Sequence, residues 1–184
     1  YGAAAVADGG EVLLRGICPS DLKVPLEEFQ KAGAAVDADE KNRQIRICMG
    51  KRPLPLLIKT EPYPGFPTDL QSPFMAFLAT AQGTSYIEEQ VFEGRFATAK
   101  ILEQMGAVIR TEDQRAVIEG HYPLKGAVVN ACDLRGGAAL MVAALAAEGD
   151  TFIGECHHIE RGYEDICRDM AALGAHIRWV GKDS

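Results

Sequence analysis

Two Asp-Leu pairs stand immediately before stretches rich in alanine, at Asp69 and at Asp133. Aspartate is a preferred N-cap, because its carboxylate accepts a hydrogen bond from a free amide of the first helical turn. The pattern therefore predicts that both carboxylates cap helices. Gly136 and Gly137 follow the second pair. Because glycine is a poor helix former but lets a ligand approach a positive helix end, the same turn is also a candidate anion site.

Three arginines lie near these turns or at the ends of predicted strands. Arg135 follows Asp133 by two positions, whereas Arg95 and Arg161 stand at equivalent junctions between a predicted strand and a predicted helix. An arginine is most often a solvated surface residue. Loops at such junctions nevertheless gather into sites in α/β proteins. Together the three could hold a phosphate or a carboxylate through paired hydrogen bonds.

The remaining composition excludes several classes of function. The chain has 184 residues, with 19 Lys plus Arg against 26 Asp plus Glu. This acidic balance disfavours nucleic acid and anionic membranes as partners. The longest apolar run, 138–147, is too short for a membrane span. Five cysteines without a C-x-x-C spacing indicate a reducing, cytoplasmic compartment and no disulfide framework. Cys156-His157-His158 has no suitably spaced second group, so no metal site is expected, and no nucleotide-cofactor motif is present.

The chain repeats a pattern three times. Each copy has a Gly-Ala pair after an amphipathic segment, an apolar residue four positions before that glycine, and another glycine closing an alanine-rich segment upstream. The pairs begin at Gly33, Gly106 and Gly174, the apolar residues are Phe29, Leu102 and Met170, and the upstream glycines are Gly9, Gly83 and Gly149. Glycine just past a helix end is typical of a left-handed cap. The sequence therefore predicts an α/β fold of three units, each a helix, a strand, a second helix and a hairpin.

The two ends of the chain interrupt this pattern. The segment 2–10 reads as the last turns of a helix, and the third copy ends at 179–184 before a second hairpin strand. We therefore expect part of a larger fold. The strand predicted at 175–180 should have unpaired backbone groups on one side, which would invite association with another chain.

Four motifs resemble those of the UDP-N-acetylglucosamine 1-carboxyvinyltransferase family, enolpyruvyl transferases of peptidoglycan synthesis. The motifs are YPGFPTDLQ (63–71), VFEGRF (91–96), DLR (133–135) and HIERGYE (158–164). They occur in the family's order, and the similarity extends over 3–180. At Gly94 the chain departs from the asparagine common in the family, which leaves the stiffness of that loop open.

The resemblance implies a fold of two domains, each with three β-α-β-α-β-β units in a pseudo-threefold, inside-out α/β barrel with its helices inside. Residues 1–184 would form the C-terminal one as a single domain. The N-terminal domain and a crossover strand from the family's first residues would be absent. The family's reactive cysteine belongs to that absent part, so none of the five cysteines here matches it.

The resemblance also implies roles for individual residues. Asp69 would bind the 3-hydroxyl of UDP-N-acetylglucosamine and act as its general base, and Asp133 would take part in proton transfer. The residues expected to be catalytic are Asp69, Asp133, Arg135 and Arg161. Those expected to bind UDP-N-acetylglucosamine or phosphoenolpyruvate are Asp69, Val91, Phe92, Arg95, Arg135 and Arg161. No cofactor is implied.

Two other functions stay open at this point. The first is the related shikimate-pathway enolpyruvyl transferase, which shares the fold but fits the 63–71 and 91–96 motifs poorly. The second is a non-catalytic module that binds a UDP-sugar or serves as a scaffold.

Overall fold

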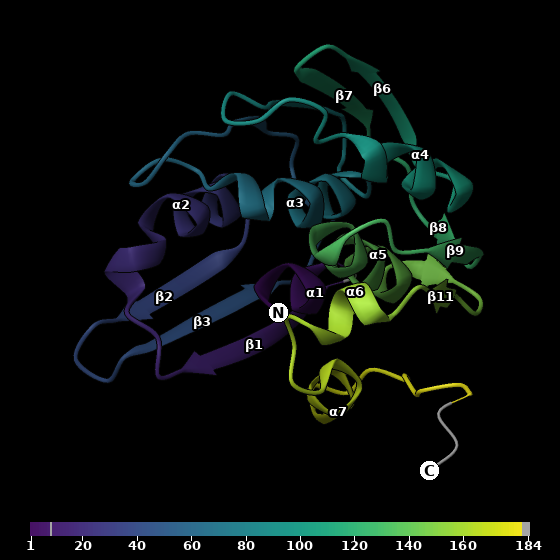
Figure 1. Cartoon of the computed structure of the whole chain (residues 1–184). Helices are drawn as coiled ribbons and strands as arrows, with labels where there is room; N and C mark the ends of the chain where they lie inside the picture. The colour runs from purple at the N-terminus through teal and green to yellow at the C-terminus, as the bar shows by residue number, and fades with distance from the viewer. Residues whose placement is uncertain (8, 182–184) are drawn as a thin grey trace.

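The middle of the chain forms the most complete of three similar units (Figure 1). Its elements in chain order are β4 (Leu57–Lys59), the 3-10 turn η2 (Thr68–Leu70), α3 (Gln71–Leu78), β5 (Thr84–Glu88), α4 (Ala97–Gln104), β6 (Val108–Glu112) and β7 (Arg115–Glu119). The sheet order is β4-β5-β7-β6, with β4 parallel to β5 and the other neighbours antiparallel. The structure, a computed structural model, describes residues 1–7 and 9–181.

The first unit repeats this arrangement without a counterpart of β4. Its elements are α1 (Gly2–Val6), β1 (Gly10–Arg15), the 3-10 turn η1 (Pro19–Leu22), α2 (Lys23–Lys31), β2 (Ala35–Asp39) and β3 (Gln44–Met49). The order β1-β3-β2 matches β5-β7-β6, with the same antiparallel pairing. The helix expected at the beginning of the chain is present as α1, and Asp8 within the expected segment lies outside the described residues.

The third unit contains only the parallel part of the pattern. Its elements are β8 (Leu124–Lys125), β9 (Val128–Asn130), α5 (Leu134–Leu145), β10 (Ala147–Glu148), β11 (Phe152–Gly154), α6 (His157–Glu160) and α7 (Ile166–Ala172). β9 runs parallel to β11, as β4 does to β5, and β8 runs parallel to β10. The similar topology agrees with the repeat predicted from the glycine spacing.

The strand expected at 175–180 is not formed, so that prediction was wrong. Residues 175–179 carry no regular structure, and 182–184 lie outside the described residues. In the other units the corresponding strand pairs with the second strand of its hairpin. A segment without such a partner has no ladder of hydrogen bonds to hold it extended. The sequence pattern predicts that the second helix of this unit begins near Tyr163, but α7 begins at Ile166.

The Gly-Ala pairs end their helices in the same way in all three units. The alanine amide donates to the carbonyl five residues earlier, at 2.9 Å from Ala34 to Phe29, 3.1 Å from Ala107 to Leu102 and 3.0 Å from Ala175 to Met170. This pattern is the Schellman motif, in which the glycine takes a left-handed conformation. The φ values of Gly33, Gly106 and Gly174 are +99°, +85° and +97°. Phe29, Leu102 and Met170 are buried, which confirms the predicted inward face.

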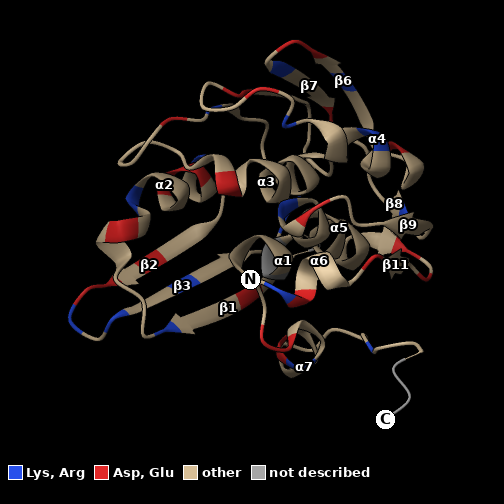
Figure 2. Ribbon diagram, in the orientation of Figure 1, with Lys and Arg blue, Asp and Glu red and all other residues tan. Residues whose placement is uncertain are grey.

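Three helices, α1, α3 and α5, contact one another in the interior, and α1 and α5 are rich in alanine. Figure 1 shows them in the middle of the molecule with the sheets around them. In Figure 2 the ribbons of α3 and α5 are almost free of charged residues. Phe74 of α3 lies 4.8 Å from Phe29 of α2 between ring centroids. The small residues of α1 and α5 let the helices approach closely, while aromatic rings such as that of Phe74 fill the space beside them.

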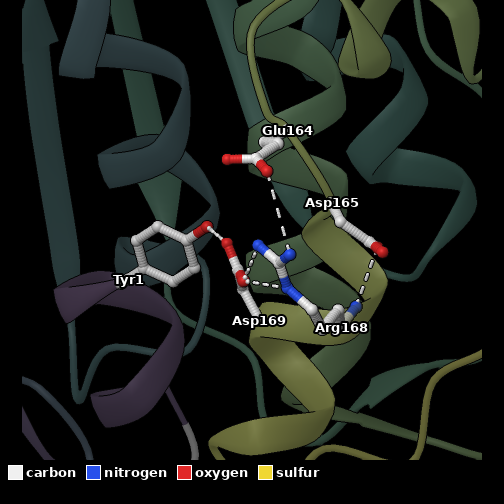
Figure 3. A network of polar contacts seen from close by, with 5 residues as sticks. All are labelled: Tyr1, Glu164, Asp165, Arg168 and Asp169. Atoms are coloured by element: carbon white, nitrogen blue, oxygen red, sulfur yellow. Dashed lines mark hydrogen bonds and ion pairs between the residues drawn. The ribbon is translucent and has the colours of Figure 1, made fainter.

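Polar contacts join the first residue to α7 (Figure 3). The Tyr1 hydroxyl donates to Oδ2 of Asp169 at 2.7 Å, and Arg168 contacts Oδ1 of the same carboxylate at 3.1 Å. The Tyr1 hydrogen bond, followed by that of Arg168, lowers the pKa of Asp169. These contacts hold the last helix of the third unit beside the first helix of the first unit.

Within residues 1–7 and 9–181, no helix combines the length and the apolar character required to cross a membrane.

Substituting Gly120 should destabilise the fold. A Cβ there would overlap the backbone carbonyl of Ala81, and the Gly120 amide donates to Gly83. Overpacking against rigid backbone costs about 1–3 kcal/mol, so G120A should lower the free energy of unfolding by at least that amount in urea titrations. Gly50 has open space around its Cβ position and serves as the control. Equal stability of G120A and G50A would contradict the close approach.

Removing the Tyr1 hydroxyl should raise the pKa of Asp169 toward its ordinary value, since that hydrogen bond is the main cause of the lowered pKa. A carboxyl with a lowered pKa in the folded state stabilises the fold above its unfolded pKa, and this contribution disappears as pH falls through the folded pKa. Y1F should therefore lose this stabilisation at a higher pH than the wild type. NMR titration of the Asp169 carboxyl carbon measures the change, with the exposed Tyr63 as the Y63F control. An unchanged titration would contradict the assignment.

Candidate functional site

The carboxyl ends of the parallel strands β4 and β5 carry a buried polar cluster. Thr60 follows β4 and Glu89 follows β5, and both are almost completely buried. The Thr60 hydroxyl donates to Oε1 of Glu89 at 2.8 Å. From Thr60 the chain loops out and returns to η2, where the Thr68 hydroxyl donates to Oε2 of Glu89 at 2.9 Å. Side chains after neighbouring parallel strands meet at one sheet edge, which is a frequent place for a site.

Asp69, the next residue after Thr68, pairs with Arg135 of α5. Nε and Nη2 of Arg135 both lie against Oδ1 of Asp69, at 2.6 Å and 2.5 Å. The Asp69 side chain is 65% exposed and that of Arg135 is 30% exposed. The pair therefore joins the 3-10 turn that precedes α3 to the first turn of α5, and the Asp69 carboxylate is open to solvent.

The two aspartates differ in their local roles. Asp133 caps α5, with Oδ1 accepting from the Gly136 amide at 2.7 Å, as the sequence predicted. Asp69 lies inside η2, and α3 begins at Gln71 without a side-chain cap. The expectation that Asp69 caps a helix was therefore wrong. The intervening 3-10 turn leaves its carboxylate free to contact Arg135.

The glycines at the start of α5 serve packing. A Cβ on Gly137 would overlap the Ile159 side chain of α6, and one on Gly136 would lie 2.7 Å from the Sγ of Cys132. The Gly136 amide donates a hydrogen bond to the Asp133 side chain, and the Gly137 amide donates one to the Asp133 carbonyl. An anion at these two amides, as expected from the glycine pair, would have to displace Asp133.

The segment after β5 is hydrogen-bonded to the buried Glu89, and on its exposed side an arginine stacks on an aromatic ring. The amides of Val91 and Phe92 donate to Oε1 of Glu89 at 3.0 Å and 3.1 Å. The Arg95 guanidinium lies over the Phe92 ring, 4.5 Å from its centroid, and the ring is 49% exposed. Gly94 between them has a φ of +71° and open space at its Cβ position. Asparagine tolerates this conformation better than most residues, so its exchange for glycine is compatible with the loop.

Arg161 follows α6 and is exposed. Its neighbour Gly162 lies so close to Leu134 that a Cβ would come within 2.5 Å of the leucine Cδ1. Because Leu134 stands between Asp133 and Arg135, the Arg161 backbone passes beside the start of α5. His157 and His158 belong to α6, with ring centroids 4.0 Å apart. The sequence pattern instead favours a strand for these two residues.

The predicted residues thus form two groups with direct contacts. One group is Asp69 with Arg135, beside the segments that carry Asp133 and Arg161. The other is the 91–95 segment with its stacked Phe92 and Arg95. The three arginines take different environments: an ion pair, an aromatic face and open solvent.

Sequence reasoning missed Glu89, which links the two groups through Thr68 and the amides of Val91 and Phe92. The sequence pattern predicts a strand over 85–91, which would place Glu89 inside it, whereas β5 ends at Glu88. The available signal was an acidic residue next to a candidate loop. In that position a buried carboxylate can accept several hydrogen bonds from the turn that follows.

The five cysteines all lie in the described part of the chain, and none forms a disulfide bond. Among residues 1–7 and 9–181, no group of three or more His, Cys, Asp or Glu side chains is arranged to hold a metal ion.

Comparison with known proteins places the chain in a family. The model of the family described as EPSP synthase (3-phosphoshikimate 1-carboxyvinyltransferase) matches residues 1–170. A UDP-N-acetylglucosamine 1-carboxyvinyltransferase of Desulfofundulus thermocisternus is 46% identical over 174 residues, which cover 95% of this chain and 71% of the relative. A UDP-N-acetylglucosamine 1-carboxyvinyltransferase 2 of Carboxydothermus hydrogenoformans is 46% identical over 96% of this chain. The chain spans 42% of the length of that second relative.

Solved structures agree with the fold. The enolpyruvyl transferase NikO from Streptomyces tendae superposes with a TM-score of 0.84 at 29% identity, over 96% of this chain and 42% of that one. An EPSP synthase from Acinetobacter baumannii has a TM-score of 0.71 at 20% identity, over 98% of this chain and 43% of that one. The second likeness concerns the fold alone. The sequence and structural matches together show that the chain belongs to the EPSP synthase family, within its group of UDP-N-acetylglucosamine 1-carboxyvinyltransferases.

Proposed function

We propose that this chain is the C-terminal domain of a transferase that moves the enolpyruvyl group of phosphoenolpyruvate to the 3-hydroxyl of UDP-N-acetylglucosamine. The product would enter peptidoglycan synthesis in the cytoplasm. The observation that carries the proposal is the contact between Asp69 and Arg135, which brings two of the family-like motifs together at one face. The names of the relatives at 42–46% identity support the choice of reaction.

The proposal includes the finer architecture. The three units would be related by a pseudo-threefold axis, as an inside-out barrel with helices inside and sheets outside. The pairwise contacts of α1, α3 and α5 support this arrangement, because these helices occupy equivalent positions in the three units. The matching strand orders of the first and second units support it too.

In the proposed reaction the sugar oxygen bonds to the enol carbon of phosphoenolpyruvate, and inorganic phosphate leaves. The attacking hydroxyl must lose its proton, so a base has to lie within hydrogen-bond reach of it. Asp69 suits this role because its side chain is 65% exposed, and Arg135 binds Oδ1 while Oδ2 accepts no hydrogen bond from the described residues. When the sugar binds, Arg135 would turn from the aspartate toward the phosphate or carboxylate of phosphoenolpyruvate.

The other residues would complete the substrate contacts. Arg161 would add a second cation beside the start of α5, where Asp133 would take part in proton transfer. Val91, through its backbone, and Phe92 would contact the UDP-sugar, and Arg95 would line the same cleft from above the Phe92 ring.

The second half of the cleft would come from an N-terminal domain. Holding two reactants in one dry, closed site accounts for a large part of such a rate enhancement, up to about 7–11 kcal/mol. The exposed Asp69 and Arg161 of this chain are screened by water, which weakens each contact to an anion. Closure against the other domain would exclude this water.

The Asp69 carboxylate should determine binding of the sugar nucleotide. D69N should raise the Kd for UDP-N-acetylglucosamine by about tenfold to a hundredfold in calorimetric titrations, because one hydrogen bond to a charged group is worth about 1.5–3 kcal/mol. E11Q is a matched control, since Glu11 forms a similar exposed pair with Arg46 on the sheet of the first unit. Equal affinities of D69N and E11Q would contradict the assignment.

The same titration separates the alternatives. Binding of shikimate 3-phosphate in place of the UDP-sugar would favour the shikimate-pathway reaction, which the description of the family model names. Binding of the UDP-sugar that is unaffected by D69N would favour a non-catalytic module.

The 184-residue chain alone should not release phosphate from phosphoenolpyruvate and UDP-N-acetylglucosamine. Adding the separately produced N-terminal half of the Carboxydothermus hydrogenoformans relative should restore turnover in a phosphate-release assay. R161A should reduce that turnover by at least about tenfold, because a charged contact to phosphoenolpyruvate is lost. R178A removes an arginine from the segment after α7 and is the control. Turnover by the lone chain above background would refute the proposal that the cleft is shared.

A further inference from the structure

Glu89 is an unusual residue to find in the interior. It is 1% exposed, and no Lys, Arg or His among the described residues forms an ion pair with it. Burying a carboxylate is costly unless hydrogen bonds replace its water. Here four donors do so, and they come from three separate segments of the chain.

Each carboxylate oxygen of Glu89 accepts hydrogen bonds from different segments. Oε1 accepts from the hydroxyl of Thr60 and from the amides of Val91 and Phe92, at 2.8–3.1 Å. Oε2 accepts from the hydroxyl of Thr68 at 2.9 Å. Thr60 in turn accepts from the Gln90 amide at 2.9 Å, so the turn after β5 is fixed at three successive amides.

Two of the three bonded segments lead directly to residues of the candidate site. Thr68 precedes Asp69, whose side chain pairs with Arg135. Val91 and Phe92 precede the arginine that stacks on the Phe92 ring. Neither segment is held here by a regular strand or helix, since η2 is a single 3-10 turn and 89–96 contains no helix or strand.

We propose that Glu89 is a positioning residue that fixes the Asp69 turn and the Val91–Phe92 segment relative to each other. One carboxylate then sets the distance between the group that receives the sugar hydroxyl and the backbone that contacts the nucleotide. Hydrogen bonds to a charged acceptor are roughly twice as strong as neutral ones, which suits a residue that must hold two loops without help from a sheet or helix. This inference rests on the proposed function for the identity of the ligand.

The contacts themselves can be tested without any ligand. In E89A the amides of Val91 and Phe92 lose their acceptor, so their hydrogen-exchange rates, followed by NMR, should rise at least tenfold. E89Q keeps one acceptor oxygen in the same place and should restore much of the protection. E88Q is the matched control, because Glu88 is adjacent and pairs with Lys59 at 3.0 Å. Unchanged exchange at both amides in E89A would overturn the proposed hold on this segment.

Binding tests the functional consequence. T68V removes only the link to the Asp69 turn, so it should raise the Kd for UDP-N-acetylglucosamine at least threefold while the Val91 and Phe92 amides stay protected. In a D69N background T68V should have no further effect, because the group that it positions is gone. A general loss of stability would weaken binding in both the wild-type and the D69N backgrounds. If T68V and D69N raise the Kd additively, the positioning role is therefore overturned.

The two proposals fail in different ways. If the wild-type chain and E88Q bind no UDP-N-acetylglucosamine, the proposed function is wrong, whereas the exchange rates still decide whether Glu89 holds the loop. If E89A does not fold, the same measurements are made on E89Q and T68V. Thermal unfolding shows whether both of these variants are folded. Binding by T68V at the wild-type affinity would overturn the positioning role while leaving the proposed function intact.

Discussion

Close contact among three short helices is the constraint on which the other parts of this structure depend. α1, α3 and α5 meet in the interior, and the small side chains of α1 and α5 let the backbones approach. The same contact determines where their N-terminal ends lie. Because α3 and α5 pack side by side, the turns before them come together, and Asp69 reaches Arg135 although 66 positions separate the two residues in the chain.

This geometry explains why the candidate site combines short turns with a rigid support. The helices and the parallel strands are held by buried apolar side chains, whereas η2 and the 89–96 segment depend on hydrogen bonds to individual residues. Loops of this kind can be reshaped by a few substitutions without affecting the core. The fold that this chain shares with an EPSP synthase at 20% identity is consistent with such a division.

Much of the fold could be predicted from the sequence because its signals are local. A glycine after an amphipathic segment marks a Schellman ending, and the spacing of Gly33, Gly106 and Gly174 therefore revealed three units. The strand expected after Gly174 failed because strand formation depends on a partner, which no local pattern contains. The parallel pairing of β9 with β11 also depends on residues far apart in the chain. Its equivalence to the pairing of β4 with β5 therefore became visible only in the structure.

The site was partly predictable for the same reason. Asp133 has a nearby amide to cap, so its local role followed from the residues around it. Asp69 has a partner on another helix, and Glu89 has donors from three segments, so neither role could be read from neighbours in the chain. Gly136 and Gly137 were misleading, since Gly136 makes room for the Sγ of Cys132 and Gly137 makes room for the side chain of Ile159 on α6.

The short sheets of the third unit have a consequence for local stability. The first and second units close with antiparallel hairpins, but the third unit has only paired strands of two or three residues, followed by the irregular segment 175–179. Regions with few sheet hydrogen bonds open more readily than the rest of a molecule. Arg161 belongs to this region, whereas Asp69 is anchored in the second unit. Arg161 and Asp69 thus stand on supports of unequal rigidity, and a ligand that contacts both would restrict the motion of the segment around Arg161.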